Sequence, residues 1–286
     1  MTRRGEAGYA LVAAVASIGV FASLALAVVA ATHGSIEDAS AELAQLRASA
    51  AADAGMAMAL HGMLSSRTGA ATGAAWSPDG VARSLRFGDT RLRIRIEDER
   101  GKVPVSGLDE LHATRLLEQA GLSGDRLLIA RDSLLDWTDD DDTPRPFGAE
   151  AEYYRVAGLR PPNGTVASID ELRVVRGFDP AVIATIKPIS TTYVSVATAF
   201  DGRFAYPRAL AVMDEAGAQG VASINRVRDL AGQRTAIAFA DPVNLLGRPF
   251  TIVVEAVLPD GARTQRRMVV EMTGSPAQPY VVRAFQ

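Results

Sequence analysis

The residues with the clearest capacity for chemistry are the carboxylates between Asp136 and Glu152. This stretch holds five aspartates and two glutamates against one arginine, a local net charge of −6. Prolines and glycines punctuate it, so we expect a loop. Carboxylates at this density repel one another unless a cation gathers them, and Ca²⁺, which takes about six to eight oxygen ligands, suits such a loop. The spacing is not that of an EF-hand, and a solvated acidic turn without an ion is the alternative interpretation.

The composition leaves little room for other catalytic or metal sites. The chain has no cysteine, which excludes disulfides, cysteine-ligated zinc, iron–sulfur clusters and thiol catalysis. It has three histidines, too few for a histidine-rich metal site. Neither a nucleotide-binding glycine loop nor a Gly-x-Ser-x-Gly motif occurs. The formal net charge of −3 argues against nucleic acid as a partner. We therefore expect a protein that is not an enzyme and binds no nucleic acid.

The elements that must position the acidic loop begin with an N-terminal helix. Residues 7–32 carry no charged side chain, and about 20 apolar residues suffice to cross a bilayer. Arg3 and Arg4 precede them, which places the N-terminus in the cytoplasm and the rest of the chain outside. Helical periodicity continues beyond the apolar run, so one helix is predicted over residues 9–64. A cleavable secretory signal or a plain signal anchor are the alternatives.

The rest of the chain predicts strands on either side of a helical region. Residues 91–97 alternate, with Leu92, Ile94 and Ile96 on one face and arginines on the other. Helices are expected at 108–120 and 125–137, at 168–176 behind a Ser-x-x-Glu capping box, and in part of 213–230. Strands follow at 250–258, 266–271 and 280–285, the first two around a tight turn.

The N-terminal residues resemble the leader of type IV pilins and of the pseudopilins of type II secretion. Arg3-Arg-Gly-Glu-Ala-Gly8 precedes the apolar helix. The resemblance implies that prepilin peptidase cuts after Gly8 and that Tyr9 becomes the methylated N-terminus, with Gly5 as a second candidate for the cut. Most pilins have glutamate at the fifth mature position, where this chain has Ala13. An intramembrane carboxylate needs a partner, so its absence is expected of the subunit at the tip, which has no subunit ahead of it.

Five motifs in the middle of the chain resemble the K-type minor pseudopilin of type II secretion, the general secretion pathway protein K family. They are, in order, Asp98-Glu-Arg-Gly-Lys102, Asp136-Trp-Thr-Asp-Asp-Asp-Asp-Thr-Pro144, Gly148-Ala-Glu150 with Tyr153-Tyr154, Pro162-Asn-Gly164, and Asp170-Glu-Leu-Arg-Val-Val-Arg-Gly177. The resemblance implies an α+β, type IV pilin-like fold, in which a long N-terminal helix packs on an antiparallel sheet and a large helical domain is inserted.

The resemblance also implies a division of the chain and a bound ion. The expected parts are a prepilin leader (1–8), the transmembrane half of the helix (9–32), the pilin helix and first strands (33–97), an inserted helical domain with the acidic loop (98–230), and the C-terminal sheet of the pilin domain (231–286). Calcium is implied as the cofactor. Its expected ligands are Asp139, Asp141 and Glu150, with Asp142 and Asp136 behind them. The chain departs from the family at Ala151, where an acidic residue is usual, and at Ser195-Val-Ala-Thr-Ala199, where Asn-x-Asn-Thr-Ala is usual.

The expected function is that of a minor pseudopilin at the tip of the type II secretion pseudopilus, which initiates or caps assembly for export of folded proteins across the outer membrane. A bulky insert cannot stack within a thin filament but can cap one. Expected partners are two other minor pseudopilins in a heterotrimeric tip complex, packed along an exposed helix stripe over residues 43–60, and prepilin peptidase. The chain is expected to cross the inner membrane once, with its main domain in the periplasm. The alternatives are a minor pilin of a type IV pilus-related system, or an unrelated membrane-anchored periplasmic calcium-binding module or hydrolase.

Overall fold

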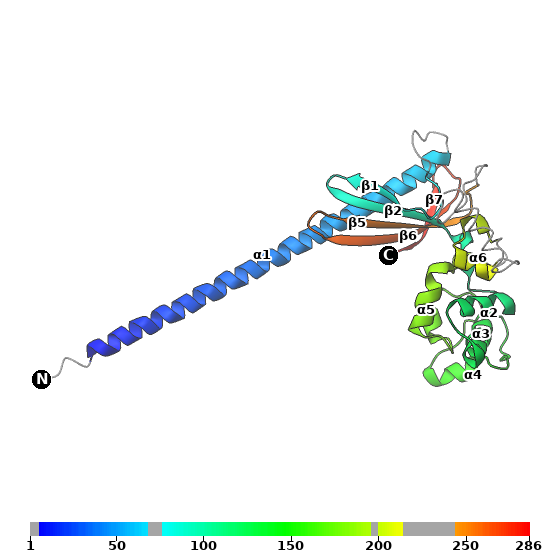
Figure 1. Cartoon of the computed structure of the whole chain (residues 1–286), viewed down its shortest axis with the longest axis horizontal. Coiled ribbons are helices and arrows are strands. Elements are labelled where there is room, and N and C mark those ends of the chain that lie inside the picture. Colours follow the sequence, from blue (N-terminus) through cyan, green and yellow to red (C-terminus); the bar gives the residue numbers. More distant parts are fainter. Residues whose placement is uncertain (1–5, 68–75, 196–199, 214–243) are drawn as a thin grey trace.

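The structure is a computed structural model that describes residues 6–67, 76–195, 200–213 and 244–286, with side chains in the first range described for 12–29 and 38–65. It combines helices with an antiparallel sheet (Figure 1). The buried apolar residues form two hydrophobic cores, one between the first helix and the sheet and one inside a group of short helices. The fold therefore has two parts, here called the sheet part and the helical part.

The first helix, α1, runs without interruption from Glu6–Arg67 over 62 residues, as predicted. Alanine, leucine and methionine favour the helix, and no proline interrupts it. Residues Val12–Val29 have a mean hydropathy of 2.5 and none of this window is buried, so the segment is long and apolar enough to cross a membrane. In Figure 1 this half of α1 projects from the rest of the molecule as a rod.

Within the described residues, the sheet part contains five antiparallel strands in the order β1-β2-β5-β6-β7. Their bounds are β1 Arg83–Phe87, β2 Thr90–Asp98, β5 Pro249–Val257, β6 Arg263–Met272 and β7 Tyr280–Phe285. The predicted strands correspond to β2, β5, β6 and β7, whereas the sequence pattern does not predict β1. Leu92, Ile94 and Ile96 are fully buried, which confirms the alternation expected for β2.

Small residues allow α1 to lie close to the sheet. Ala52 and Ala59 are fully buried, and a Cβ atom added at Gly55 would lie 2.7 Å from Val254 Cγ1. The exposed stripe predicted over residues 43–60 is wrong in its second half, because Met56 and Leu60 pack into the sheet part's own core. Leu43 and Leu46 remain exposed, at 47% and 61% of their surface.

The helical part lies in the chain between β2 and β5, two strands that are neighbours in the sheet. Its helices are η1 Glu99–Gly101, α2 Glu110–Gln119, α3 Gly124–Thr138, α4 Ala151–Tyr154, η2 Arg155–Ala157, η3 Ile169–Val174, α5 Pro180–Ile186, η4 Lys187–Ile189, η5 Gly202–Phe204 and α6 Pro207–Met213, with a short parallel pair of strands, β3 Val103–Pro104 and β4 Ser190–Thr191. The helical part has its own hydrophobic core. The chain therefore leaves the sheet after β2, forms this separate part and returns to the sheet at β5 (Figure 1).

Local structure differs from the sequence prediction at two helices. The segment with the capping-box pattern is the 3₁₀-helix η3, and its Glu171 carboxylate accepts from Ala167 N (2.9 Å) and Trp137 Nε1 (2.8 Å). Glu171 thus joins two helices rather than closing a capping box. Helix α5 was not predicted, although Asp179 caps it and Pro180 opens it. The helix expected within 213–230 and the boundary at residue 230 lie outside the described residues.

Candidate metal centre

The acidic loop begins where α3 ends. Asp136 lies in the last turn of that helix and is fully buried, and Asp139 is the residue that terminates it. The chain then passes through the exposed run of aspartates and returns to the helical part at Glu150, which precedes α4 and is 5% exposed. The loop therefore brings the carboxylates of Asp139 and Glu150 close together.

Three of the five predicted ligands meet. Asp139, Asp141 and Glu150 each offer one carboxylate oxygen, and these oxygens all lie within 4.8 Å of one another. Glu150 is buried, Asp139 is half-buried and Asp141 is exposed, so the group is open to solvent on one side. This spacing suits oxygen ligands around a calcium ion.

Several buried oxygens of this group lack hydrogen-bond partners among the residues that the structure describes. These oxygens are Oε1 and Oε2 of Glu150 and Oδ1 of Asp139. Burial raises the pKa of Glu150 to about 7, with further contributions from Asp136, Asp139, Asp142 and Asp141. A buried carboxylate without a hydrogen bond is unfavourable. A cation placed here would remove that cost, so the residues present fit a metal ion.

The other two predicted ligands make different contacts. Asp142 Oδ1 accepts from Asn163 Nδ2 at 2.9 Å, and the same amide donates to the carbonyl oxygen of Asp141 at 2.8 Å. Asn163 holds a left-handed backbone conformation, φ 45°, which asparagine tolerates better than most residues. The Pro-Asn-Gly motif thus fixes the outer edge of the acidic loop.

Asp136 is bound by Arg145, the single basic residue of the acidic stretch. The guanidinium Nη1 lies 2.7 Å from Asp136 Oδ1 and 2.5 Å from Asp139 Oδ2. Burial raises the pKa of Asp136 even though Arg145 opposes the shift. The only signal in the sequence was that Arg145 stands between two prolines inside the acidic stretch.

Aromatic packing and backbone hydrogen bonds connect the motifs that lie next to the acidic loop. The rings of Trp137 and Tyr154 pack edge to face with centroids 5.0 Å apart, and Tyr154 Oη accepts from Arg176 N at 3.1 Å. Arg176 Nη1 in turn donates to the carbonyl oxygen of Gly148 at 3.0 Å. The Asp-Trp, Gly-Ala-Glu, Tyr-Tyr and Asp-Glu-Leu-Arg motifs are therefore parts of one packed unit.

A second group of charged residues joins the helical part to the sheet. It comes from the Asp98–Lys102 motif. Lys102 Nζ lies 2.6 Å from Glu99 Oε1 and 3.0 Å from Glu97 Oε2, and all three residues are buried. Burial alone would lower the pKa of Lys102, but Glu99 and Glu97 raise it above its ordinary value. Lys102 is thus held as a cation inside the junction.

Arg248, at the return of the chain to the sheet, completes this junction. Its Nη2 lies 2.6 Å from Asp98 Oδ2 and 3.1 Å from Asp201 Oδ2. Burial raises the pKa of Asp98 to about 6, against the effect of Arg248. For Asp201, burial is opposed by Arg203 and Arg248, and its pKa is lowered. Two carboxylates of unequal burial share one guanidinium.

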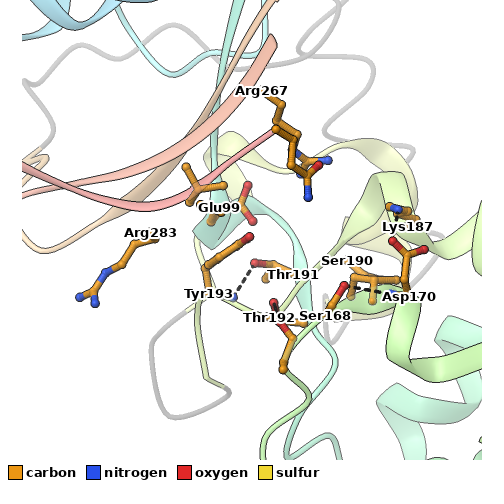
Figure 2. A pocket seen from close by; sticks show the side chains of 15 residues that line it. Glu99, Ser168, Asp170, Lys187, Ser190, Thr191, Thr192, Tyr193, Arg267 and Arg283 are labelled. Atoms are coloured by element: carbon orange, nitrogen blue, oxygen red, sulfur yellow. Dashed lines mark hydrogen bonds and ion pairs between the residues drawn. The ribbon is translucent and has the colours of Figure 1, made fainter. Parts of the chain in front are cut away.

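A cavity of about 290 Å³ lies beside this junction, between β6, β7 and the segment around β4. In Figure 2, Glu99 lies near the middle of the view, Arg267 lies above it, and Lys187 and Asp170 lie at the right. Lys187 Nζ pairs with Asp170 Oδ2 at 2.6 Å, and Arg283 pairs with Glu271 outside the cavity at 2.7 Å. The cavity thus lies where the helical part meets β6 and β7, and polar side chains from both parts line it.

The comparisons with known proteins single out the helical part. Residues 99–195 match the family model described as type II secretion system (T2SS), protein K. This segment is similar to the type II secretion system protein K family. It begins in the Asp98–Lys102 motif and contains the acidic loop, so the resemblance to the K-type minor pseudopilins is confirmed.

Two further similarities agree with the protein K match. Type II secretion system protein K of Klebsiella pneumoniae is 34% identical over 104 residues, which is 36% of this chain and 31% of that relative. The chain thus matches about a third of the relative's length. A chain in the crystal structure of the GspK-GspI-GspJ complex from the enterotoxigenic Escherichia coli type 2 secretion system has a TM-score of 0.57, at 16% identity over 85% of this chain and 95% of that chain. The two share a fold over most of their length.

Proposed function

We propose that this chain is a minor pseudopilin at the tip of a type II secretion pseudopilus. The observation that carries the proposal is the placement of the segment that matches protein K between neighbouring strands of a sheet that packs against a long apolar helix. On this reading the sheet part is a type IV pilin-like scaffold and the helical part is an inserted domain. The role is structural: the chain initiates or caps assembly of the filament, and its partners are two other minor pseudopilins.

The shape of the molecule supports a position at the tip. The helical part lies at the end of the molecule opposite the free end of α1 (Figure 1). A subunit placed ahead of this one would meet the helical part. The exposed rod of α1, by contrast, leaves room for the helices of subunits behind. Ala13 in place of the usual glutamate agrees with a subunit that pairs with none ahead.

The secretion function is tested by deletion and complementation in the source organism. Deletion of the gene is expected to abolish export of type II secreted proteins, and the full chain is expected to restore it. A chain that lacks residues 99–195 should not restore export even when it reaches the membrane. Unchanged export after deletion would contradict the proposal.

We also propose that α1 anchors the chain in the inner membrane once, with the N-terminus cytoplasmic and the main domain periplasmic. The segment Val12–Val29 and the preceding arginines support this arrangement. Prepilin peptidase is expected to cut after Gly8 and to leave Tyr9 as a methylated N-terminus. Co-expression with active or inactive peptidase, followed by N-terminal sequencing, tests this. A mature chain that begins at neither Tyr9 nor Glu6 would contradict both the pseudopilin proposal and the alternative of a type IV minor pilin.

We propose calcium as the ion of the acidic centre, held by Asp139, Asp141 and Glu150. The unpaired buried oxygens of Glu150 and Asp139 Oδ1 are the observations that support it. Bound there, the ion would neutralise the repulsion between the ends of the loop and tie α3 to α4. Its role is structural, because it closes the loop around the core of the helical part.

Thermal unfolding with calcium or with chelator tests the ion. The native protein is expected to melt several degrees higher with calcium at about 100 times its dissociation constant, equivalent to about 2.7 kcal/mol. Glu150→Gln should lose most of this shift, whereas Glu152→Gln, at an exposed neighbouring position, should keep it. An identical midpoint with calcium and with chelator would contradict a structural ion.

A further inference from the structure

We infer that Arg145 is a resident counter-cation of the acidic centre, which weakens calcium binding and holds the loop closed when no ion is bound. The inference rests on the calcium site proposed above. It adds that a side chain of the protein itself sets the strength of that site.

The position of Arg145 is built into the fold. Its guanidinium Nη1 bridges Asp136 Oδ1 and Asp139 Oδ2, and its backbone N donates to the Asp136 carboxylate at 3.2 Å. Pro144 and Pro146 flank it. A residue before proline is restricted to extended conformations, and each proline has a fixed φ. The backbone therefore presents Arg145 to Asp136 with little freedom.

The contacts divide the carboxylates between two cations. Arg145 binds Oδ2 of Asp139, whereas Oδ1 has no hydrogen-bond partner within the described part of the chain. Asp136 is fully buried and is satisfied by Arg145, and it is not among the three residues whose oxygens converge. An ion can thus use Oδ1 of Asp139 while the guanidinium keeps Oδ2.

This arrangement has two electrostatic consequences. Calcium affinity increases with the negative charge of the ligand set, and a fixed positive charge that shares a ligand reduces it. Without an ion, Arg145 is the cation that keeps Asp136 and Asp139 together, and removal of one partner from a buried ion pair leaves an uncompensated charge. Loss of the arginine charge should therefore tighten calcium binding and destabilise the calcium-free protein.

Calorimetric titration of calcium chloride into the full-length protein in detergent, after removal of divalent ions, tests the inference. Arg145→Gln is expected to bind calcium about tenfold more tightly than the native protein. Arg145→Lys, which keeps the charge but not the forked geometry, should stay within about threefold. Arg160→Gln removes an equal charge at an exposed position and should leave the affinity unchanged. In chelator, Arg145→Gln should melt below Arg160→Gln.

The outcomes separate this inference from the calcium proposal. Native protein that binds calcium, together with an Arg145→Gln variant of equal or weaker affinity, would overturn the role of Arg145 alone. Weaker binding in both Arg145→Gln and Arg145→Lys would mean that the side chain only shapes the loop, which also overturns it. Absence of binding in the native protein and in all variants would overturn the calcium site and the inference with it.

Discussion

At the scale of single residues, the acidic centre depends on a close approach that only glycine permits. A Cβ atom added at Gly148 would overlap Oδ2 of the buried Asp136 carboxylate. Asp136 cannot move away easily, because it is fully buried and Arg145 binds both of its carboxylate oxygens. The glycine of the Gly-Ala-Glu motif is thus required by the aspartate of the Asp-Trp motif.

Gly148→Ala is expected to destabilise the protein by about 1–3 kcal/mol, the usual cost of forcing extra atoms into a packed site. Gly164→Ala is the matched control, because a Cβ atom there would meet one backbone oxygen at 3.8 Å, an ordinary contact. Denaturant unfolding of both variants in the same detergent measures the difference. Equal stability of the two variants would contradict the proposed packing.

The sequence predicts the carboxylates of this centre but not the cation and the amide that bind them. The sequence predicts Asp139, Asp141 and Glu150 as ligands, and the structure brings their oxygens together. Arg145 and Asn163 were missed as members of the centre. Their roles depend on which carboxylate each one meets across the loop, and charge counts or motif order contain no such information.

At the scale of elements, α1 and the sheet fit together through small side chains. Ala52 is fully buried between them, whereas Ala57 on the same helix is exposed. Periodicity predicted this long helix and the alternation in β2 because both patterns are strong. It did not predict which half of the stripe would remain free, because that depends on where the sheet ends along the helix.

Ala52→Leu is expected to lower the free energy of unfolding by about 1–3 kcal/mol, because the larger side chain forces the helix away from the sheet. Ala57→Leu makes the same chemical change at an exposed position and should alter stability by less than about 0.5 kcal/mol. Unfolding of the full chain in a fixed detergent compares them. A destabilisation of similar size in both would show that α1 does not pack as described.

The junction between the two parts predicts opposite pH effects for two aspartates. Burial raises the pKa of Asp98 to about 6, so the folded protein holds a proton that the unfolded chain, with a pKa near 4, has lost. Its contribution to stability is therefore greatest at low pH and declines as pH rises from about 4 to 6. The pKa of Asp201 is lowered, so its contribution is present above pH 4 and is lost on acidification.

Asp98→Asn is expected to gain about 2–3 kcal/mol relative to the native protein between pH 4 and pH 7, because the variant has no charge to bury. Asp201→Asn should instead become less stable than the native protein as pH rises. Unfolding curves at several pH values from about 2 to 7 measure both trends, because the change for Asp201 is expected below about pH 4 and the change for Asp98 above it. Parallel pH profiles for the native protein and Asp98→Asn would contradict the assigned burial of Asp98.

At the scale of the whole molecule, the structure combines a long apolar helix, an antiparallel sheet and a helical part that contains the segment similar to protein K. The sequence predicted this combination from motif order and from strands on both sides of helices. It could not supply the sheet order, in which β2 and β5 become neighbours although the helical part separates them in the chain. That pairing is a long-range contact, which local patterns do not encode.

The measurement that tests the proposed function most directly is assembly with the proposed partners, two minor pseudopilins encoded in the same genome. The full chain, co-expressed with its GspI-type and GspJ-type counterparts and purified in detergent, is expected to elute as one complex with one copy of each, as measured by light scattering. A Leu43→Glu, Leu46→Glu variant, altered where α1 stays exposed, should keep its melting temperature and weaken the complex. A native chain that remains monomeric, while the other two still associate with each other, would contradict the account.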